Sequence, residues 1–270
     1  MRLKVTLRVD EPTAVAFDHQ HYLMALIYNL LDHSAADYAQ FLHDKGYTHR
    51  DEPGRAFKMF HFSGLRTRAR RLQGGVIVFM PGRAEWFIGS PVPLFLQNLA
   101  GALTQAARIR VGESRFHVAA IETIAAPEFQ EGRAQFSCLS PIVAAVRRPE
   151  EAGGGTYYLR PKTDRNAFEA AIRTNLIRKH RVLYGMDPHD DTLRLLFDAR
   201  YLERDAHQGT RKVCVNGIDV IGAFCPLEIE CAPPLLRLLW DCGVGEKNSS
   251  GFGMVEAVGS SQSFPAGKGA

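Results

Sequence analysis

The order in which hydrophobic periods follow one another constrains the fold of this chain more than any other feature of its sequence. Residues 1–9 alternate between apolar and polar side chains, which is typical of a half-buried strand with one charged face. Residues 19–31 change to a helical period, and five large apolar side chains share one face of that helix: Leu23, Leu26, Ile27, Leu30 and Leu31. A strand and an amphipathic helix in direct succession favour a sheet covered by helices on one side.

The rest of the first half completes a recognisable order of elements. Ser34 is a plausible N-cap for a second, short helix, whose apolar stripe is formed by Tyr38, Phe41 and Leu42. Further patterns follow along the chain: strands over 57–65 and 74–80, a helix over 91–107 and a strand over 108–124. Strand, helix, strand, strand, helix, strand is the order of a ferredoxin-like domain.

The second half repeats this order more loosely. Its patterns are a strand over 134–147, a helix over 164–184, a strand pair over 193–203 and 210–231 with an ambiguous first member, a short helix over 233–243 and a last strand over 252–258. We therefore predict an α+β protein of two tandem ferredoxin-like (βαββαβ) domains. The N-terminal domain is expected over 1–124 and the C-terminal domain over 125–259, with a loose polar tail over 260–270.

Composition excludes several classes of protein. A hydrophobic fraction of 46% and a charged fraction of 23% are globular values. The sequence lacks an apolar stretch of the roughly 18 residues that a membrane span needs, and its charged start is unlike a signal peptide. Five cysteines without a CxxC pair fit a reducing cytoplasm and argue against a thiolate zinc site of the usual spacing. A net charge of +4 permits binding to nucleic acid without requiring it.

The most unusual local feature is the glycine loop GVGEKNSSGFG over residues 243–253. Its four glycines flank a polar centre, and glycine allows positive φ and close backbone approach to an anion. A helix precedes the loop and a strand follows it, which is the reverse of a dinucleotide-binding fingerprint, and the string of a P-loop is absent. A helix C-cap followed by a flexible connector is the alternative interpretation.

The succession of helix, glycine loop and final strand resembles the repeat-associated RNA-binding proteins of CRISPR systems. Within them, VGEKNSSGFGMV is similar to the CRISPR-associated endoribonuclease six family, which cuts CRISPR repeat RNA into guide units. Four further segments are similar to parts of that family in the same order: HQHYLMALIYNLL (19–31), FLHDKG (41–46), KMFHFSGL (58–65) and SPIVAAVR (140–147).

This resemblance implies the identity of the catalytic residues. Tyr28 and His43 fall where the family has its catalytic tyrosine and histidine, and Lys58 matches its catalytic lysine. Both Tyr28 and His43 lie off the apolar stripes of their helices, so each should point toward solvent or a cleft; without the resemblance they would be taken as surface side chains. The stretch before Lys58 looks longer than usual, which leaves His49 and His61 as alternative members of the set.

These residue types suit cleavage of RNA without a metal ion or other cofactor. A ribose 2′-hydroxyl can attack the adjacent phosphate, leaving a 2′,3′-cyclic phosphate and a 5′-hydroxyl. Histidine can serve as base or acid, tyrosine can position or donate, and lysine can stabilise the developing charge. Neither DxD nor HExxH, which would indicate metal-dependent hydrolysis, occurs in the sequence. Whether Tyr28 or His43 is the base stays open.

The resemblance also implies the partner, CRISPR repeat RNA as precursor and product, and leaves open a CRISPR effector complex and a homodimer. The predicted RNA-binding residues come from the glycine loop and from four arginines at a predicted hairpin: Gly243, Gly245, Lys247, Asn248, Ser249, Ser250, Gly251, Gly253, Arg66, Arg68, Arg70 and Arg71. Smaller basic clusters occur at 147–148 and 178–181. The alternative functions are a non-catalytic RNA-binding subunit and a small-molecule phosphate-binding protein.

Overall fold

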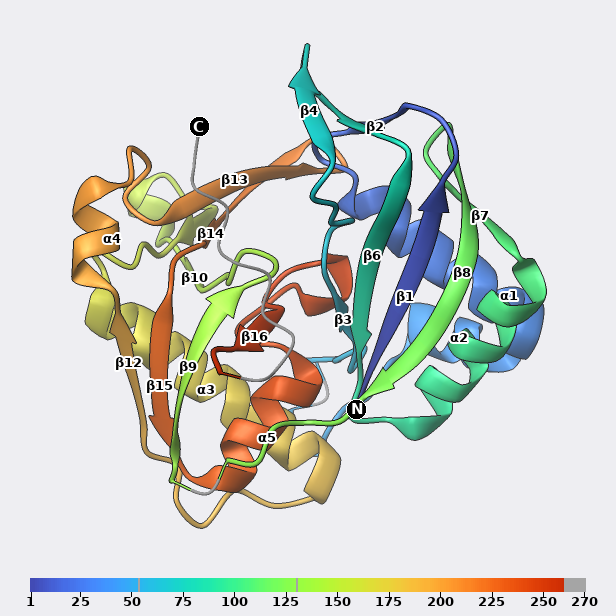
Figure 1. The fold of residues 1–270 in the computed structure, drawn as a ribbon. Helices are drawn as coiled ribbons and strands as arrows, with labels where there is room; N and C mark the ends of the chain where they lie inside the picture. Colours follow the sequence, from blue (N-terminus) through green and yellow to red (C-terminus); the bar gives the residue numbers. More distant parts are fainter. Residues whose placement is uncertain (53, 130, 260–270) are drawn as a thin grey trace.

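The computed structural model describes residues 1–52, 54–129 and 131–259 (Figure 1). The predicted loose tail, 260–270, lies outside the described residues. Figure 1 shows two sheets side by side, each with helices on one face, and this arrangement confirms the predicted α+β fold of two ferredoxin-like domains. None of the helices in the described part of the chain combines the length and the apolar character that a membrane crossing requires.

The N-terminal sheet is antiparallel and has the strand order β3-β6-β1-β8-β7. Its strands are β1 (Arg2–Val9), β3 (His61–Phe62), β6 (Gly82–Gly89), β7 (Arg108–Val111) and β8 (Ser114–Ile124). The helices α1 (Gln20–Asp44) and α2 (Pro93–Ala106) cover one face. In chain order, β1, β3, β6 and β8 are the four strands of a ferredoxin-like domain, and β7 is an addition at the edge.

The C-terminal sheet has the equivalent order, β12-β15-β9-β16. Its strands and helices are β9 (Arg133–Cys138), α3 (Arg165–Tyr184), β12 (Leu193–Phe197), β15 (Leu227–Cys231), α5 (Pro233–Cys242) and β16 (Val255–Ala257). Several short elements are inserted into this frame: β10 (Ala145–Arg147), η1 (Glu150–Ala152), β11 (Thr156–Tyr158), α4 (Ala199–Arg204), β13 (Thr210–Val215), β14 (Ile218–Ala223) and η2 (Asn248–Ser250). We retain 1–124 and 125–259 as the proposed limits of the two domains.

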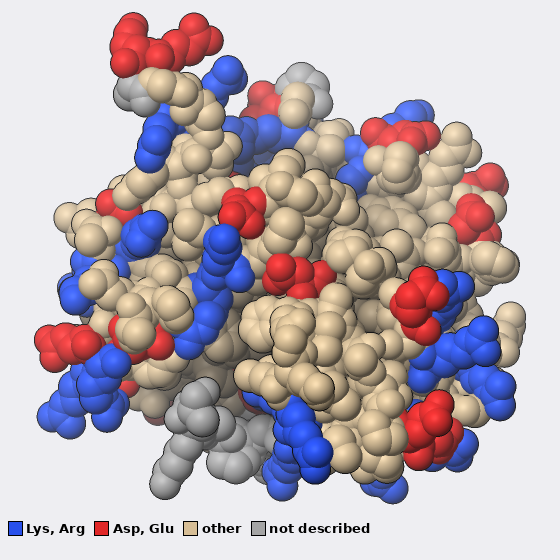
Figure 2. All heavy atoms as spheres, turned by 90° about the horizontal axis from the view of Figure 1, so that it is seen from above, with Lys and Arg blue, Asp and Glu red and all other residues tan. Residues whose placement is uncertain are grey.

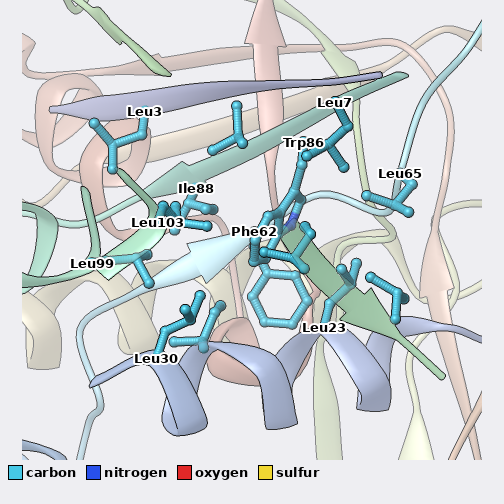
Figure 3. Packing of buried hydrophobic residues seen from close by; sticks show 14 of the residues in the cluster. Leu3, Leu7, Leu23, Leu30, Phe62, Leu65, Trp86, Ile88, Leu99 and Leu103 are labelled. Carbon is cyan, nitrogen blue, oxygen red and sulfur yellow. The ribbon is translucent and has the colours of Figure 1, made fainter. Parts of the chain in front are cut away.

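Each domain is organised around its own apolar core. In the N-terminal core the buried alternate residues of β1 lie over the apolar faces of α1 and α2, and the rings of Phe62 and Trp86 fill the space between them (Figure 3). The predicted inward face of the first strand is confirmed, because Leu3, Val5, Leu7 and Val9 are all buried. A second core gathers residues from β9, α3, β12, β15 and α5.

The alternation in residues 1–9 predicted that the polar face of β1 is exposed, but part of this face is buried. Arg2 is only 1% exposed, because the C-terminal domain covers it. Its guanidinium group donates to the carbonyl oxygens of Trp240 and Val255, and it stacks on the Trp240 ring at 3.4 Å from the centroid. A side chain at the second position of the chain therefore joins the two domains.

Some predicted elements are divided differently in the structure. The stretch 108–124 forms the hairpin β7–β8, 193–203 forms β12 and α4, and 210–231 forms the hairpin β13–β14 and β15. The predicted break between the first two helices occurs at Ala35, which has non-helical angles of φ −158° and ψ 66° within α1. Ser34 is not an N-cap, since its hydroxyl donates back to the carbonyl oxygen of Leu30 at 3.1 Å.

The arginine run also lies differently from the prediction. A three-stranded sheet is formed by β2 (Thr13–Ala16), β5 (Val76–Phe79) and β4 (Arg70–Gln73), with β4 at its edge. The hairpin turn is at 74–75, so Arg70 and Arg71 lie within a strand, not in the connection between two strands. Charged side chains on an edge strand resist pairing with other chains, and the two arginines of β4 fit its position at the edge of the sheet.

Candidate functional site

The bend in α1 brings together two residues that are distant along the helix. Tyr28 and His43 are 15 positions apart, which in a straight helix would separate their Cα atoms by about 22 Å. Their ring centroids are instead 6.0 Å apart, and the planes meet edge to face. The non-helical backbone at Ala35 kinks the helix between the two residues. This local break therefore creates the juxtaposition that the sequence could not show.

Lys58 joins this pair from the segment that precedes β3. Its Nζ donates to the carbonyl oxygen of His43 at 2.8 Å. Gly46, at φ +67°, ends the helix in the left-handed region, and a Cβ there would lie only 3.2 Å from the Lys58 side chain. The absence of a side chain at Gly46 lets Lys58 cross the helix end. Burial lowers the pKa of Lys58 from its ordinary value.

The environments of the two rings are unlike each other. Tyr28 is half-buried, with its ring 6.0 Å from that of Phe60, so it packs against the core more than predicted. Burial raises its pKa to about 12, which keeps the hydroxyl protonated at neutral pH. The His43 side chain is 76% exposed, and its Nδ1 lies 2.8 Å from Asp44 Oδ1. A proton held on Nδ1 by Asp44 leaves Nε2 as the free nitrogen of the neutral ring.

The long stretch before Lys58 forms a loop that reaches the C-terminal domain. Tyr47 and Phe57 exchange backbone hydrogen bonds and close the loop at its base. Glu52 then forms ion pairs of 2.9 Å with both Arg178 and Arg181 of α3. The segment that carries Lys58 is therefore tied to the second domain.

The two alternative histidines occupy different surroundings. His49 is in this loop, and its side chain is 13% exposed with Nδ1 3.5 Å from Asp51 Oδ2. His61 is 0% exposed and lies at the domain interface against Gly89 and Gly243. Burial, followed by the nearby cations of Arg2 and Lys179, lowers its pKa well below the usual range. In this structure His61 therefore has no exposed surface with which to contact a bound strand.

The glycine loop is compact and packed against protein. All four of its glycines have positive φ. A Cβ on Gly251 would lie 2.7 Å from the Phe62 ring of the N-terminal domain, and a Cβ on Gly253 would lie 2.0 Å from the Val244 carbonyl oxygen. The close backbone approach that these two glycines permit is thus to the protein itself. This packing does not fit a flexible connector.

A cleft of about 430 Å³ separates the glycine loop from the segment that carries Lys58. Its lining comes from both domains: Gly54, Arg55, Ala56, Phe57, Lys58, Met59, Phe60, Asn175, Lys179, Cys242, Glu246, Lys247, Asn248 and Ser249. The predicted residues Lys58, Lys247, Asn248 and Ser249 therefore share one cleft. Arg55, Asn175 and Lys179 also line it and were not predicted as part of the site.

The predicted arginines are divided between two settings. Arg66 is half-buried, exchanges backbone hydrogen bonds with Glu85 of β6, and has its pKa lowered by burial. Arg68, Arg70 and Arg71 are exposed, the last two on β4. Figure 2 shows Lys and Arg side chains spread over one face of the molecule with Asp and Glu among them. The structure does not bring these arginines into the cleft.

Both halves of the chain match models of one protein family. Residues 14–122 match the model described as "CRISPR-associated protein Cas6, N-terminal", and residues 124–257 match "CRISPR associated protein Cas6, C-terminal". The chain is 28% identical over 261 residues to CRISPR-associated endoribonuclease Cas6 1 of Methanocaldococcus jannaschii, covering 96% of this chain and 93% of the relative. It is 27% identical over 251 residues to CRISPR-associated endoribonuclease Cas6 of Pyrococcus furiosus, covering 93% and 86%.

Solved structures agree with the fold. A structure described as CRISPR associated protein Cas6 superimposes with a TM-score of 0.75 at 26% identity, over 96% of this chain and 99% of that one. A Cas6-related protein from Pyrococcus furiosus gives a TM-score of 0.80 at 19% identity over the same shares. A Cas6 product complex gives 0.63 at 17% identity, over 95% and 99%. Each of these likenesses covers both ferredoxin-like domains.

Proposed function

The chain belongs to the Cas6 family of CRISPR-associated endoribonucleases, and we propose that it cleaves CRISPR repeat RNA by metal-independent attack of a ribose 2′-hydroxyl. The observation that carries this proposal is that the Tyr28 and His43 rings, on the two sides of the break in α1, lie together and that Lys58 reaches the His43 backbone. The Tyr28 and His43 rings are 6.0 Å apart, and the Lys58 ammonium reaches the His43 carbonyl oxygen at 2.8 Å. A protein that only bound RNA would need no such set.

The environments of these groups suggest a division of roles. His43 is exposed and has Nε2 available, so it takes the proton from the 2′-hydroxyl or returns one to the leaving 5′-oxygen. Tyr28, which stays protonated, donates a hydrogen bond to a reacting oxygen. Lys58 uses one N–H on the His43 carbonyl and keeps two for phosphate oxygens, where it stabilises the charge that develops.

The RNA strand would reach this set along the cleft between the domains. Lys247, Asn248 and Ser249 line the cleft opposite Lys58, and Arg55 adds a cation beside them. The exposed Arg68, Arg70 and Arg71 would bind phosphates farther along the strand. The glycines would contribute by shaping the loop, since the sites of Gly251 and Gly253 are filled by protein contacts.

Incubation of the protein with labelled CRISPR repeat RNA in EDTA tests the chemistry. We expect cleavage to persist in the chelator and to leave a 2′,3′-cyclic phosphate and a 5′-hydroxyl. An RNA with a single 2′-deoxynucleotide at the scissile position should bind with unchanged affinity and resist cleavage. Activity that requires added magnesium, or a product with a 5′-phosphate, would refute the mechanism.

A further inference from the structure

A buried lysine lies at the centre of the glycine loop. Lys179 of α3 is 2% exposed, and its Nζ donates to three oxygens of the loop. These are the carbonyl oxygens of Gly243 at 2.9 Å and Gly245 at 2.8 Å, and Oδ1 of Asn248 at 2.7 Å. An ammonium group has three N–H donors, so this loop accepts all of them.

Asn248 extends this arrangement to the other end of the loop. Its Nδ2 donates to the carbonyl oxygens of Val244 and Phe252, while its Oδ1 accepts from Lys179. The second and the next-to-last residues of the loop are thereby held by the Asn248 side chain, which itself accepts a hydrogen bond from Lys179. The loop then packs its Gly251 against Phe62 of the N-terminal domain.

Lys179 differs in burial from the exposed arginines Arg68, Arg70 and Arg71, which are candidates for RNA binding. Lys179 lines the cleft together with Lys247 and Ser249, but with 2% exposure it has almost no surface to offer a phosphate. Burying an ammonium group is unfavourable unless its hydrogen bonds are satisfied. A lysine placed here must therefore act on the loop.

We propose that Lys179 is a positioning residue, whose ammonium group holds the glycine loop in the conformation that presents residues 247–249 to the cleft. The loop is then organised before RNA arrives, and binding does not have to order it. The inference rests on the proposed function for its consequence in RNA binding. The ordering of the loop itself can be tested without RNA.

Hydrogen–deuterium exchange of the free protein tests the ordering directly. In Lys179→Met, which fills similar space without donors, we expect amides of 243–253 to exchange at least about tenfold faster, because hydrogen bonds to a charged group contribute on that order. Peptides from β1 and β6 should be unchanged, which shows that the N-terminal domain stays folded. The matched control is Lys162→Met, which removes an exposed lysine just before α3. Equal loop exchange in the wild type and Lys179→Met would overturn the proposal.

Chemical rescue separates the ammonium group from the space it fills. Lys179→Ala lacks the atoms of n-propylammonium, so that ion should restore slow exchange of the loop, whereas n-propanol should not. Equal exchange with the two compounds would contradict a role for the charge. In the wild type at pH 6, below the pKa of about 8 to which burial lowers this lysine, its ¹⁵Nζ signal should show protons that exchange slowly with water. A signal typical of exposed lysines would also count against the proposal, and this measurement needs no variant.

The consequence for RNA separates affinity from chemistry. For Lys179→Met we expect the Kd for repeat RNA to rise about tenfold or more, with the single-turnover rate at saturating protein within about threefold of wild type. A lost rate at unchanged Kd would overturn the positioning role. If the wild type itself failed to cut the RNA, the proposed function would fail, while the exchange experiment would still decide the role of Lys179.

Discussion

At the scale of single residues, the candidate catalytic side chains differ in exposure, and this difference predicts how each contributes to cleavage and to stability. The exposed His43 ring pairs with Asp44 through Nδ1, whereas the Tyr28 ring is packed against Phe60. We therefore expect His43→Ala to lose about 10²–10⁴ in the single-turnover rate of RNA cleavage, the range for general acid–base catalysis. Because the ring is 76% exposed, the melting temperature and RNA affinity should stay close to those of wild type.

His49→Ala is the control for this prediction. Of the two alternative histidines, His61 is buried and His49 has a side chain that is 13% exposed. We expect it to retain most of the cleavage rate. Wild-type cleavage by His43→Ala together with an inactive His49→Ala would move the active site to the loop between Tyr47 and Phe57.

Tyr28 gives a prediction about pH. Burial raises its pKa to about 12, so the hydroxyl is protonated throughout pH 6–10 and does not titrate there. Tyr28→Phe should therefore lower the cleavage rate at every pH without changing the shape of the pH–rate profile. The ring contact with Phe60 is kept, so the free energy of unfolding should change by less than about 1 kcal/mol. The prediction would be wrong if the pH–rate profile of wild type fell at alkaline pH and that of Tyr28→Phe did not, because Tyr28 would then be the group that ionises.

At the scale of elements, hydrophobic period predicted the general order of strands and helices but missed one central strand of the N-terminal sheet. The predicted strand 74–80 is β5 of the small three-stranded sheet, and the strand that pairs with β1 is β6 (Gly82–Gly89), which was not predicted. The alternation in residues 1–9 predicted β1 correctly because one face is buried along its whole length. The hairpin β13–β14 was missed although its turn is Asn216–Gly217, both with positive φ, which is the strongest short-range hairpin signal. The break at Ala35 was predicted one residue away, at Ser34, although neither glycine nor proline occurs in α1; the contact that this break allows between Tyr28 and His43 was not predicted from periodicity.

The candidate site was likewise predicted only in part from the sequence. The resemblance to a family predicted Tyr28, His43 and Lys58, and the structure brings them together. Lys179 was noted only as part of a basic cluster. Its spacing from Phe168, Ile172 and Leu176 places it on the buried face of α3, which is the signal that could have distinguished it from Arg178.

The edge strand β4 gives a prediction about salt. Arg70→Ala with Arg71→Ala should weaken RNA binding and flatten the dependence of log Kd on log salt by about 0.7–0.9 for each lost phosphate contact. Saturating protein should recover most of the cleavage rate, because neither side chain lines the cleft. Gln73→Ala, an exposed polar change on the same strand, is the control. An unchanged salt slope in the arginine variant would show that β4 does not contact RNA.

The glycine loop gives a prediction in which packing outweighs charge. A side chain at Gly251 would meet Phe62 at 2.7 Å in a left-handed backbone, so Gly251→Val should displace the loop from the N-terminal domain. We expect a larger rise in Kd for repeat RNA than in Lys247→Ala, which removes one screened charge from the cleft wall. Binding titrations on the two variants, with folding checked by circular dichroism, measure this. Equal Kd values for Gly251→Val and wild type would make the packing irrelevant to binding.

At the scale of the whole molecule, the cleft exists only because the two domains hold a fixed relation. The contacts that set this relation join residues far apart in the sequence, such as Arg2 and Trp240, and a single sequence gives no sign of them. Glu52 adds a second connection by pairing with Arg178 and Arg181. The position of Lys58 relative to the glycine loop therefore depends on side chains outside the cleft.

Arg2 provides the test of this dependence. Arg2→Met keeps much of the apolar length but leaves the buried carbonyl oxygens of Trp240 and Val255 without their donor. Each unsatisfied buried acceptor costs about 1–3 kcal/mol, so with two acceptors we expect the free energy of unfolding in urea to fall by about 2–6 kcal/mol. Arg8→Met is the matched control, because Arg8 lies on the same strand, is 59% exposed and pairs with Asp10 at the surface. Its effect should stay within about 0.5 kcal/mol. Equal stability of the two variants would mean that the buried guanidinium does not hold the domains together, and the cleft would then depend on the apolar contacts of the interface alone.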